Sequence, residues 1–259
     1  MLFDTHAHLT SETFDEDRDR LIESYPSQNI ALILNPAWNF ESSFQASALS
    51  QKHDSIYAAV GNHPDSAHEL SPEHQDAILG AYKKLVRENN RIRAIGEVGL
   101  DYHYETVPRE MQQHAFRVQM ALARELNLPV IVHKREAHED GLKIIDEFPE
   151  VKGVFHCYSG SVEMALELVS RGWFIGFTGI LTFKNAALQQ EVARSVPLDH
   201  IVIETDSPYL APIPYRGRRC DPGMLPRVAQ KLAELRHLSL DEVEAATFIN
   251  GKRLYRIDN

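Results

Sequence analysis

The chain has 259 residues, of which 43% are hydrophobic, and its formal net charge is −10 at pH 7. This length suits one α/β barrel domain of roughly 250 residues, whose core needs no covalent staples. The two cysteines, Cys157 and Cys220, form no disulfide framework, which is typical of a reducing cytoplasm. The negative charge argues against a protein that coats nucleic acid without metal, because duplex-coating proteins are usually basic.

The first residues, MLFDTHAHL, lack the basic segment and the long apolar run of a signal peptide. No apolar run approaches the roughly 18 residues that a membrane-spanning helix needs. No pattern indicates a coiled coil or another obligate assembly. We therefore expect a soluble, cytoplasmic monomer with no membrane partner.

Eight short apolar runs alternate with amphipathic segments along the chain. All but the first run contain valine or isoleucine, and most are followed by glycine, proline or polar residues, which is typical of a buried strand. The predicted strands cover 2–8, 30–34, 56–61, 92–98, 129–133, 152–156, 173–177 and 200–204.

Helical spacing of apolar residues fills the gaps between these runs. A helix is predicted to begin at Ser71-Pro72, because a capping residue there precedes proline. The clearest helix covers 109–126 and ends before Pro129, which cannot continue it. Two more helices are predicted at 223–236 and 240–250, with Ser239 as N-cap of the second and Glu242 completing a capping box.

Strands that alternate with helices over short connections predict a parallel sheet. Eight such units favour a closed (β/α)8 TIM barrel, and an open sheet of seven or eight strands is the alternative. We predict the α/β class and a single domain over residues 1–259.

Histidines and acids stand at the ends of the predicted strands, where barrel enzymes keep their chemistry. His6 and His8 follow the first run two residues apart, so both side chains point the same way in a strand. Four imidazoles and two carboxylates at one rim predict a site for two divalent cations, and hydrogen-bonded core histidines are the alternative. The predicted metal ligands are His6, His8, Glu97, His133, His156 and Asp206.

Some of these residues have further predicted roles. Glu97, which lies between glycines, is expected to bridge the two cations and to be essential for catalysis. Asp206 is expected to bind a cation and to accept a proton from the attacking water. Asp4 is expected to orient an imidazole, and Glu204 to support the ligands rather than join them.

Four residues near the ligands are predicted to contact substrate. His63 ends the third run and is expected to bind substrate or to protonate the leaving group. Arg135 offers a fork that matches phosphate, and a salt bridge to a loop acid is the alternative. Asp101 is a candidate for substrate contact or for ordering a loop, and Ser159 lies in a turn whose N–H groups suit an oxyanion. A basic turn either binds phosphate or is a solvated loop: Arg216, Arg218 and Arg219.

Seen together, the motifs around these residues resemble the TatD family of metal-dependent deoxyribonucleases, within the amidohydrolase-like group of TIM barrels. The resemblance covers nearly the whole chain. In order, the matching blocks are HAH, GNHP, GEVGLDY, IVHKREA, FHCYSGS, FTG followed by TFKN, and ETDSPYLAP.

The resemblance implies up to two divalent cations in a (β/α)8 barrel. By position, one cation is implied to bind His6, His8, Glu97 and Asp206, and the other Glu97, His133 and His156. One departure is Cys220-Asp221, where the family commonly has Asn-Glu, which predicts an altered substrate preference. Lys134, after His133, is expected to alter the local charge.

The sequence therefore predicts a divalent-metal-dependent hydrolase of ester bonds, with Zn, Mg, Mn, Co and Ni as candidate cations. The resemblance adds the substrate, which is single-stranded DNA cleaved from 3′ to 5′, or another phosphodiester. A hydrolase of a small amide, lactone or phosphoester is one alternative. A catalytically silent metal-binding scaffold is another, although such a scaffold has no physical need for six buried ionisable groups.

Overall fold

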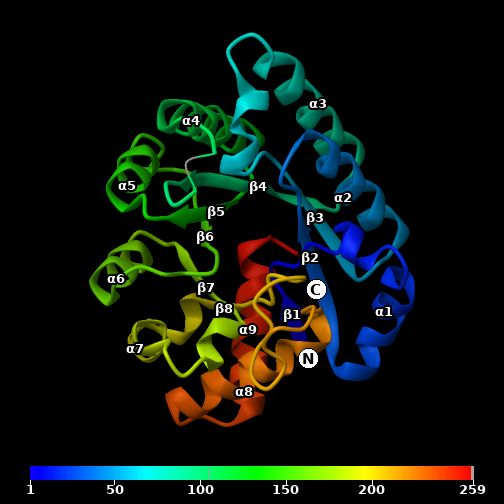
Figure 1. Ribbon diagram of the computed structural model, residues 1–259, viewed down its shortest axis with the longest axis vertical. Coiled ribbons are helices and arrows are strands. Elements are labelled where there is room, and N and C mark those ends of the chain that lie inside the picture. Colours follow the sequence, from blue (N-terminus) through cyan, green and yellow to red (C-terminus); the bar gives the residue numbers. More distant parts are fainter. Residues whose placement is uncertain (105, 258–259) are drawn as a thin grey trace. The chain divides into compact units, whose positions relative to one another are not determined.

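The computed structural model describes residues 1–104 and 106–257. Its strands form one eight-stranded sheet in which the order in space follows the order in the chain (Figure 1). The strands are β1 (Leu2–Asp4), β2 (Ile30–Pro36), β3 (Ile56–Val60), β4 (Ile92–Asp101), β5 (Val130–Arg135), β6 (Gly153–Phe155), β7 (Phe174–Phe177) and β8 (Ile201–Ile203).

Helices connect successive strands, and paired strands run parallel, as in β4 with β5 and β7 with β8. The α-helices are α1 (Arg18–Ser24), α2 (Phe40–Lys52), α3 (Gln75–Glu88), α4 (Arg109–Leu126), α5 (His138–Asp146), α6 (Val162–Ser170), α7 (Ala187–Ser195), α8 (Leu225–Arg236) and α9 (Leu240–Leu254). None of the helices in the described ranges is long and apolar enough to cross a membrane.

The first and last strands of the sheet are neighbours. The Thr5 N–H donates to the carbonyl of Ile203 at 3.2 Å, just beyond the end of β1. The His8 N–H donates to the carbonyl of Ser207 at 2.8 Å, and Ala7 pairs with Ser207 in a parallel bridge. These bonds connect the last strand with the first, and the fold is the predicted (β/α)8 barrel.

The chain divides into two compact units, Met1–Asn35 with Cys157–Asn259 and Pro36–His156. In the first unit, the ring of Phe3 on β1 packs 5.8 Å from that of Tyr255, which follows α9, and both side chains are buried. In the second, Leu70 and Ala115 belong to a buried cluster that joins α4 to the segment before α3. Each unit therefore has apolar packing of its own.

All eight strands were predicted, with ends that differ from the prediction by one or two residues in most strands and by more in the first and the fourth. The first was predicted to reach His8, whereas β1 ends at Asp4 because the Asp4 carboxylate accepts the His6 N–H and takes it out of the ladder. The fourth is longer than predicted and reaches Asp101, so it carries a second carboxylate beyond Glu97.

The helices also follow the sequence patterns. Helix α4 has the predicted bounds, and the Ser239–Glu242 capping box of α9 is confirmed. The helix predicted to begin at Pro72 begins at Gln75, so that prediction was wrong. The Ser71 carbonyl accepts N–H groups from His74 and Gln75, which makes a turn of the intervening residues.

Candidate metal centre

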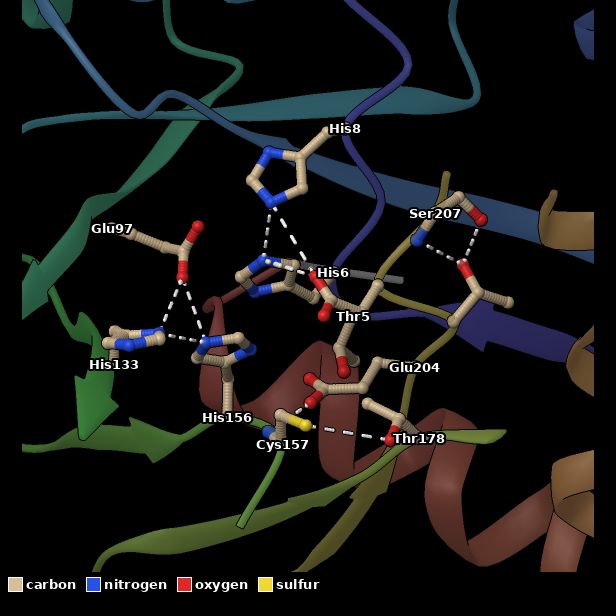
Figure 2. A network of polar contacts seen from close by, with 12 residues as sticks. Thr5, His6, His8, Glu97, His133, His156, Cys157, Thr178, Glu204 and Ser207 are labelled. Carbon is tan, nitrogen blue, oxygen red and sulfur yellow. Dashed lines mark hydrogen bonds and ion pairs between the residues drawn. The ribbon is translucent and has the colours of Figure 1, made fainter. Parts of the chain in front are cut away.

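In the first unit, His6, His8 and Asp206 converge directly beyond β1 and β8. The Nε2 atoms of His6 and His8 lie 3.1 Å apart, and each lies 3.6 Å from Oδ1 of Asp206 (Figure 2 shows the two histidines). Both histidines are buried. Because Ala7 between them is fixed by a hydrogen bond from its N–H to the Leu34 carbonyl, the two rings are held on one side of the chain.

The backbone around Asp206 is also fixed. Its φ of 57° lies in the left-handed region, which aspartate tolerates better than most residues. The preceding Thr205 donates its N–H and its hydroxyl to the two carboxylate oxygens of Asp4, at 3.0 and 2.6 Å. The same carboxylate accepts the His6 N–H, so Asp4 holds the backbone of two ligand segments rather than an imidazole. Burial raises the pKa of Asp4 to about 8, against the hydrogen bonds from Thr205.

In the second unit, Glu97 within β4, His133 within β5 and His156 directly after β6 form a similar triplet. Oε1 of Glu97 lies 2.8 Å from Nε2 of His156 and 3.6 Å from Nδ1 of His133 (Figure 2). The two imidazole nitrogens lie 3.3 Å apart. Gly99, two residues after Glu97, must be glycine because a Cβ there would collide with the His133 carbonyl oxygen.

These distances fit metal ligation. Two ligand atoms that each lie 2.0–2.1 Å from a tetrahedral zinc ion are about 3.3 Å apart. The first triplet has separations of 3.1, 3.6 and 3.6 Å. The second has 2.8, 3.3 and 3.6 Å. Electron pairs turned toward one point repel unless a proton or a cation lies between them, so both triplets suit a divalent cation.

Asp101 fixes the orientation of His133. Its Oδ2 lies 3.0 Å from Nε2 of His133, so a proton on Nε2 leaves the Nδ1 lone pair facing Glu97. Burial disfavours the charged carboxylate, but the hydrogen bond and charge of His133 outweigh it and keep the pKa of Asp101 below its ordinary value. Burial likewise opposes the imidazolium, yet the hydrogen bonds to Asp101 and Glu97 raise the pKa of His133. Asp101, predicted to contact substrate or to order a loop, is 3% exposed, faces a ligand and accepts the His103 N–H of the loop after β4.

His63 lies beside this second triplet. Its ring centre is 4.4 Å from that of His133, and ligand atoms of His63, Glu97 and His133 lie within 4.8 Å of one another. Its Nδ1 accepts the Asp65 N–H at 3.2 Å, so the proton of the neutral ring is on Nε2. The side chain is partly exposed, so it is accessible for the predicted contact with substrate.

The other predicted substrate contacts have different surroundings. The guanidinium of Arg135 stacks on the ring of Tyr104, with its carbon 4.8 Å from the ring centre. Ser159 is exposed. Lys134 is buried with its stem beside Gly141 of α5, where burial lowers its pKa to about 8, so it faces away from His133.

The basic turn and the Cys220-Asp221 pair serve the structure of the first unit. Arg219 is exposed to solvent and makes hydrogen bonds of 2.9 and 2.7 Å to Asp17, so the guanidinium of this member of the turn is paired with a carboxylate. Cys220 is buried with its sulfur 4.0 Å from the Thr205 carbonyl. The Asp221 carboxylate accepts the Gly223 N–H and caps a short turn, Pro222–Met224. Cys220, where the family commonly has asparagine, therefore contacts Thr205, the residue before Asp206.

The sequence predicted a supporting role for Glu204 but not the contact that it makes, and it missed Tyr104. Glu204 accepts the Cys157 N–H at 2.5 Å, and so fixes the residue that follows His156 (Figure 2). Tyr104 lies over Arg135, and the run Asp101-Tyr102-His103-Tyr104 carried a signal for it in its two aromatic residues directly after an acid.

Comparison with known proteins decides the family. Residues 3–256 match the family described as TatD related DNase. The chain belongs to the TatD family. It is 39% identical over 260 residues to YabD, named a metal-dependent hydrolase, of Bacillus subtilis (strain 168), and the match covers 100% of both chains. It is 34% identical over 264 residues to the 3′-5′ ssDNA/RNA exonuclease TatD of Erwinia tasmaniensis, covering 99% of this chain and 100% of the other.

A solved structure gives the same result for the fold. The TatD homologue YjjV of Escherichia coli K12 superposes with a TM-score of 0.92 at 28% identity. The match covers 99% of this chain and 98% of YjjV. YabD, which matches this chain over its whole length, is named a metal-dependent hydrolase. This chain also has His, Glu and Asp groups that could bind metal, as predicted.

Proposed function

We propose that this TatD family member hydrolyses phosphodiester bonds of single-stranded DNA, removing nucleotides from the 3′ end in a divalent-metal-dependent reaction. The observation that carries the proposal is the pair of triplets, each with two imidazoles and one carboxylate at ligand spacing. The substrate and the polarity follow the relatives that are named 3′-5′ ssDNA/RNA exonucleases.

The proposed cofactors are two divalent cations in each chain. His6, His8 and Asp206 would hold one, and Glu97, His133 and His156 the other. When bound, such cations supply a water that loses its proton near neutral pH and positive charge beside the phosphoryl oxygens. Imidazole with carboxylate suits Zn, Mn, Co and Ni, and Mg is favoured less because it prefers oxygen ligands.

The protein side chains complete the proposed chemistry. The Asp206 carboxylate accepts a proton from the attacking water, since it is 14% exposed while its histidine partners are nearly buried. His63 donates the proton on Nε2 to the leaving oxygen, because its Nδ1 is occupied by the Asp65 N–H. Asp101 keeps the Nδ1 lone pair of His133 directed at Glu97.

The test is hydrolysis by metal-stripped protein titrated separately with Mg, Mn, Zn and Co. The substrates are a 5′-labelled single-stranded DNA, whose shortened products stay visible, and bis(p-nitrophenyl) phosphate as a small phosphodiester. We expect stepwise shortening only with added metal, no shortening by Glu97→Gln, and full activity in the control Glu88→Gln on the exposed end of α3.

Two results would count against the proposal. Cleavage that persists in the presence of a chelator would contradict metal dependence. Hydrolysis of the small phosphodiester without any shortening of DNA would keep the metal centre but reject nucleic acid as substrate, and amides, lactones and small phosphoesters would be assayed next.

A further inference from the structure

An aromatic side chain stands exposed just after β4, the strand that carries Glu97. Tyr104 follows β4, and 60% of its surface is accessible to solvent. The guanidinium of Arg135, at the end of β5, lies against the ring with its carbon 4.8 Å from the ring centre. The ring of His103 meets it edge-on at 84°, with the ring centres 4.8 Å apart. A broad aromatic surface is thus held by two neighbours and still faces solvent.

This group of side chains is built on the residues that orient the ligand His133. The Asp101 carboxylate bonds His133 through Oδ2 and accepts the His103 N–H through Oδ1 at 2.9 Å. The Tyr102 N–H donates to the Arg135 carbonyl at 3.0 Å, which joins the loop after β4 to the end of β5. Arg135 is two residues beyond His133 in β5, or about 6.6 Å along the strand at about 3.3 Å per residue.

The charges around Tyr104 suit a nucleotide. Arg135 places positive charge against one face of the ring, where it strengthens stacking and lies within reach of a backbone phosphate. The carboxylate of Glu136 is engaged by His103, with 2.7 Å between Oε1 and Nδ1. In a chain of net charge −10, such a local cation is needed to attract a polyanion.

We propose that Tyr104, backed by Arg135 and flanked by His103, is a stacking site for one nucleobase of the single-stranded substrate. The inference rests on the proposed function and adds a base-binding site to it. Every nucleobase has a π-face, so stacking accepts any sequence, but it requires a base that is free of a complementary strand. The site therefore favours single strands and unpaired 3′ ends over paired ones.

The experiment combines protein variants with substrates that lack one base. The variants are Tyr104→Ala, Tyr104→Phe and the control Tyr57→Ala, which removes a tyrosine stacked on Arg91 at the amino end of β3. The substrates are a short oligothymidylate, the same strand with one abasic nucleotide placed in turn at each of the last 3′ positions, and bis(p-nitrophenyl) phosphate. The constant kcat/KM is measured for each pair with the metal that activates the wild type.

We expect Tyr104→Ala to reduce kcat/KM for the oligothymidylate, relative to the small phosphodiester, by about 5- to 150-fold, the range reported for stacking of one base. Tyr104→Phe and Tyr57→Ala should keep the wild-type ratio. On the strand that is abasic at one particular position, kcat/KM of the wild type should fall by the same factor as kcat/KM of Tyr104→Ala falls on the intact strand. Combining that abasic position with Tyr104→Ala should reduce kcat/KM no further.

The outcomes separate the stacking site from the proposed function. If wild type shortens DNA and Tyr104→Ala does so with an unchanged ratio, the stacking site is wrong while the function stands. The site is also wrong if the losses from Tyr104→Ala and from every abasic position multiply, because the ring and the base then act independently. If wild type hydrolyses only the small phosphodiester, the proposed nucleic-acid substrate fails, and the stacking site fails with it.

Discussion

Asp101→Asn tests how the second triplet is oriented. The Asp101 carboxylate accepts two partly buried hydrogen bonds, from Nε2 of His133 at 3.0 Å and from the His103 N–H at 2.9 Å. Asparagine has the same shape but only one oxygen, so it can accept only one of the two. If its NH2 group faces His133 instead, it selects the tautomer with the proton on Nδ1, directed at Glu97 where the cation is proposed.

The size of the effect follows from the lost bond. A hydrogen bond to a charged group contributes about 1.5–3 kcal/mol, which is about 10- to 150-fold in an equilibrium constant. Replacing the partners of metal-bound histidines typically costs 10–100-fold in affinity or activity. We therefore expect Asp101→Asn to weaken binding of the cation at His133 and His156 by about 10- to 100-fold.

Isothermal titration of metal-stripped protein with Zn2+ measures this affinity directly, with kcat on the small phosphodiester as a second readout. The matched control is Asp140→Asn, which removes a carboxylate that bonds Tyr102 and Gln113 rather than a histidine. Thermal unfolding of the metal-stripped variants checks that both fold. A zinc affinity of Asp101→Asn within twofold of the wild type would refute the orienting role.

Three further changes test the fold around the site. The hydrogen bond from Arg219 is the largest cause that keeps the pKa of Asp17 below its ordinary value. The contribution of this pair to the free energy of unfolding is therefore present above the unfolded pKa of about 3.9, and it is lost as the pH falls through the folded pKa. Asp17→Asn should then lower the free energy of unfolding in urea by about 0.2–1 kcal/mol at pH 7, and by progressively less below about pH 3.9; an equal loss at all pH values would contradict the ion pair. Ser239→Ala removes the N-cap of α9 and should cost about 1 kcal/mol by the same measurement, whereas Ser195→Ala at the end of α7 should cost less. Gly176→Ala would place a Cβ 2.8 Å from both oxygens of the buried Glu204, so we expect it to lower the melting temperature and, by moving Cys157 next to His156, kcat as well; wild-type values of both would show that the site absorbs the methyl group.

The sequence predicted the fold because its patterns were local. All but the first strand were short runs that contain valine or isoleucine, and each ligand lay near the end of a run or just after it, so the topology of a parallel barrel brought the ligands to one rim. The end of β1 could not be predicted in this way. Its regular pairing stops where the Asp4 side chain takes the His6 N–H, and that bond depends on Thr205, about 200 residues away.

Several side-chain roles were beyond the sequence for the same reason. Asp101 was a candidate for substrate contact or for ordering a loop, and the extra length of β4 brings it to His133 on the next strand. Arg219 belonged to a turn of three arginines, and only the fold shows that Asp17 engages it. In contrast, the orientation of Lys134 could have been predicted from the sequence. Adjacent residues of a strand face opposite sides, so Lys134 points away from His133.

The metal content of purified variants tests the central claim most directly. Metal-stripped protein is saturated with Zn2+, freed of excess by gel filtration and analysed for zinc per chain by mass spectrometry. The proposed centre predicts two zinc ions in the wild type, and one each in His8→Ala and His156→Ala, which remove one ligand from different triplets. Zinc contents that equal the wild type in both variants, or a wild type that retains none, would contradict a metal centre built from these residues.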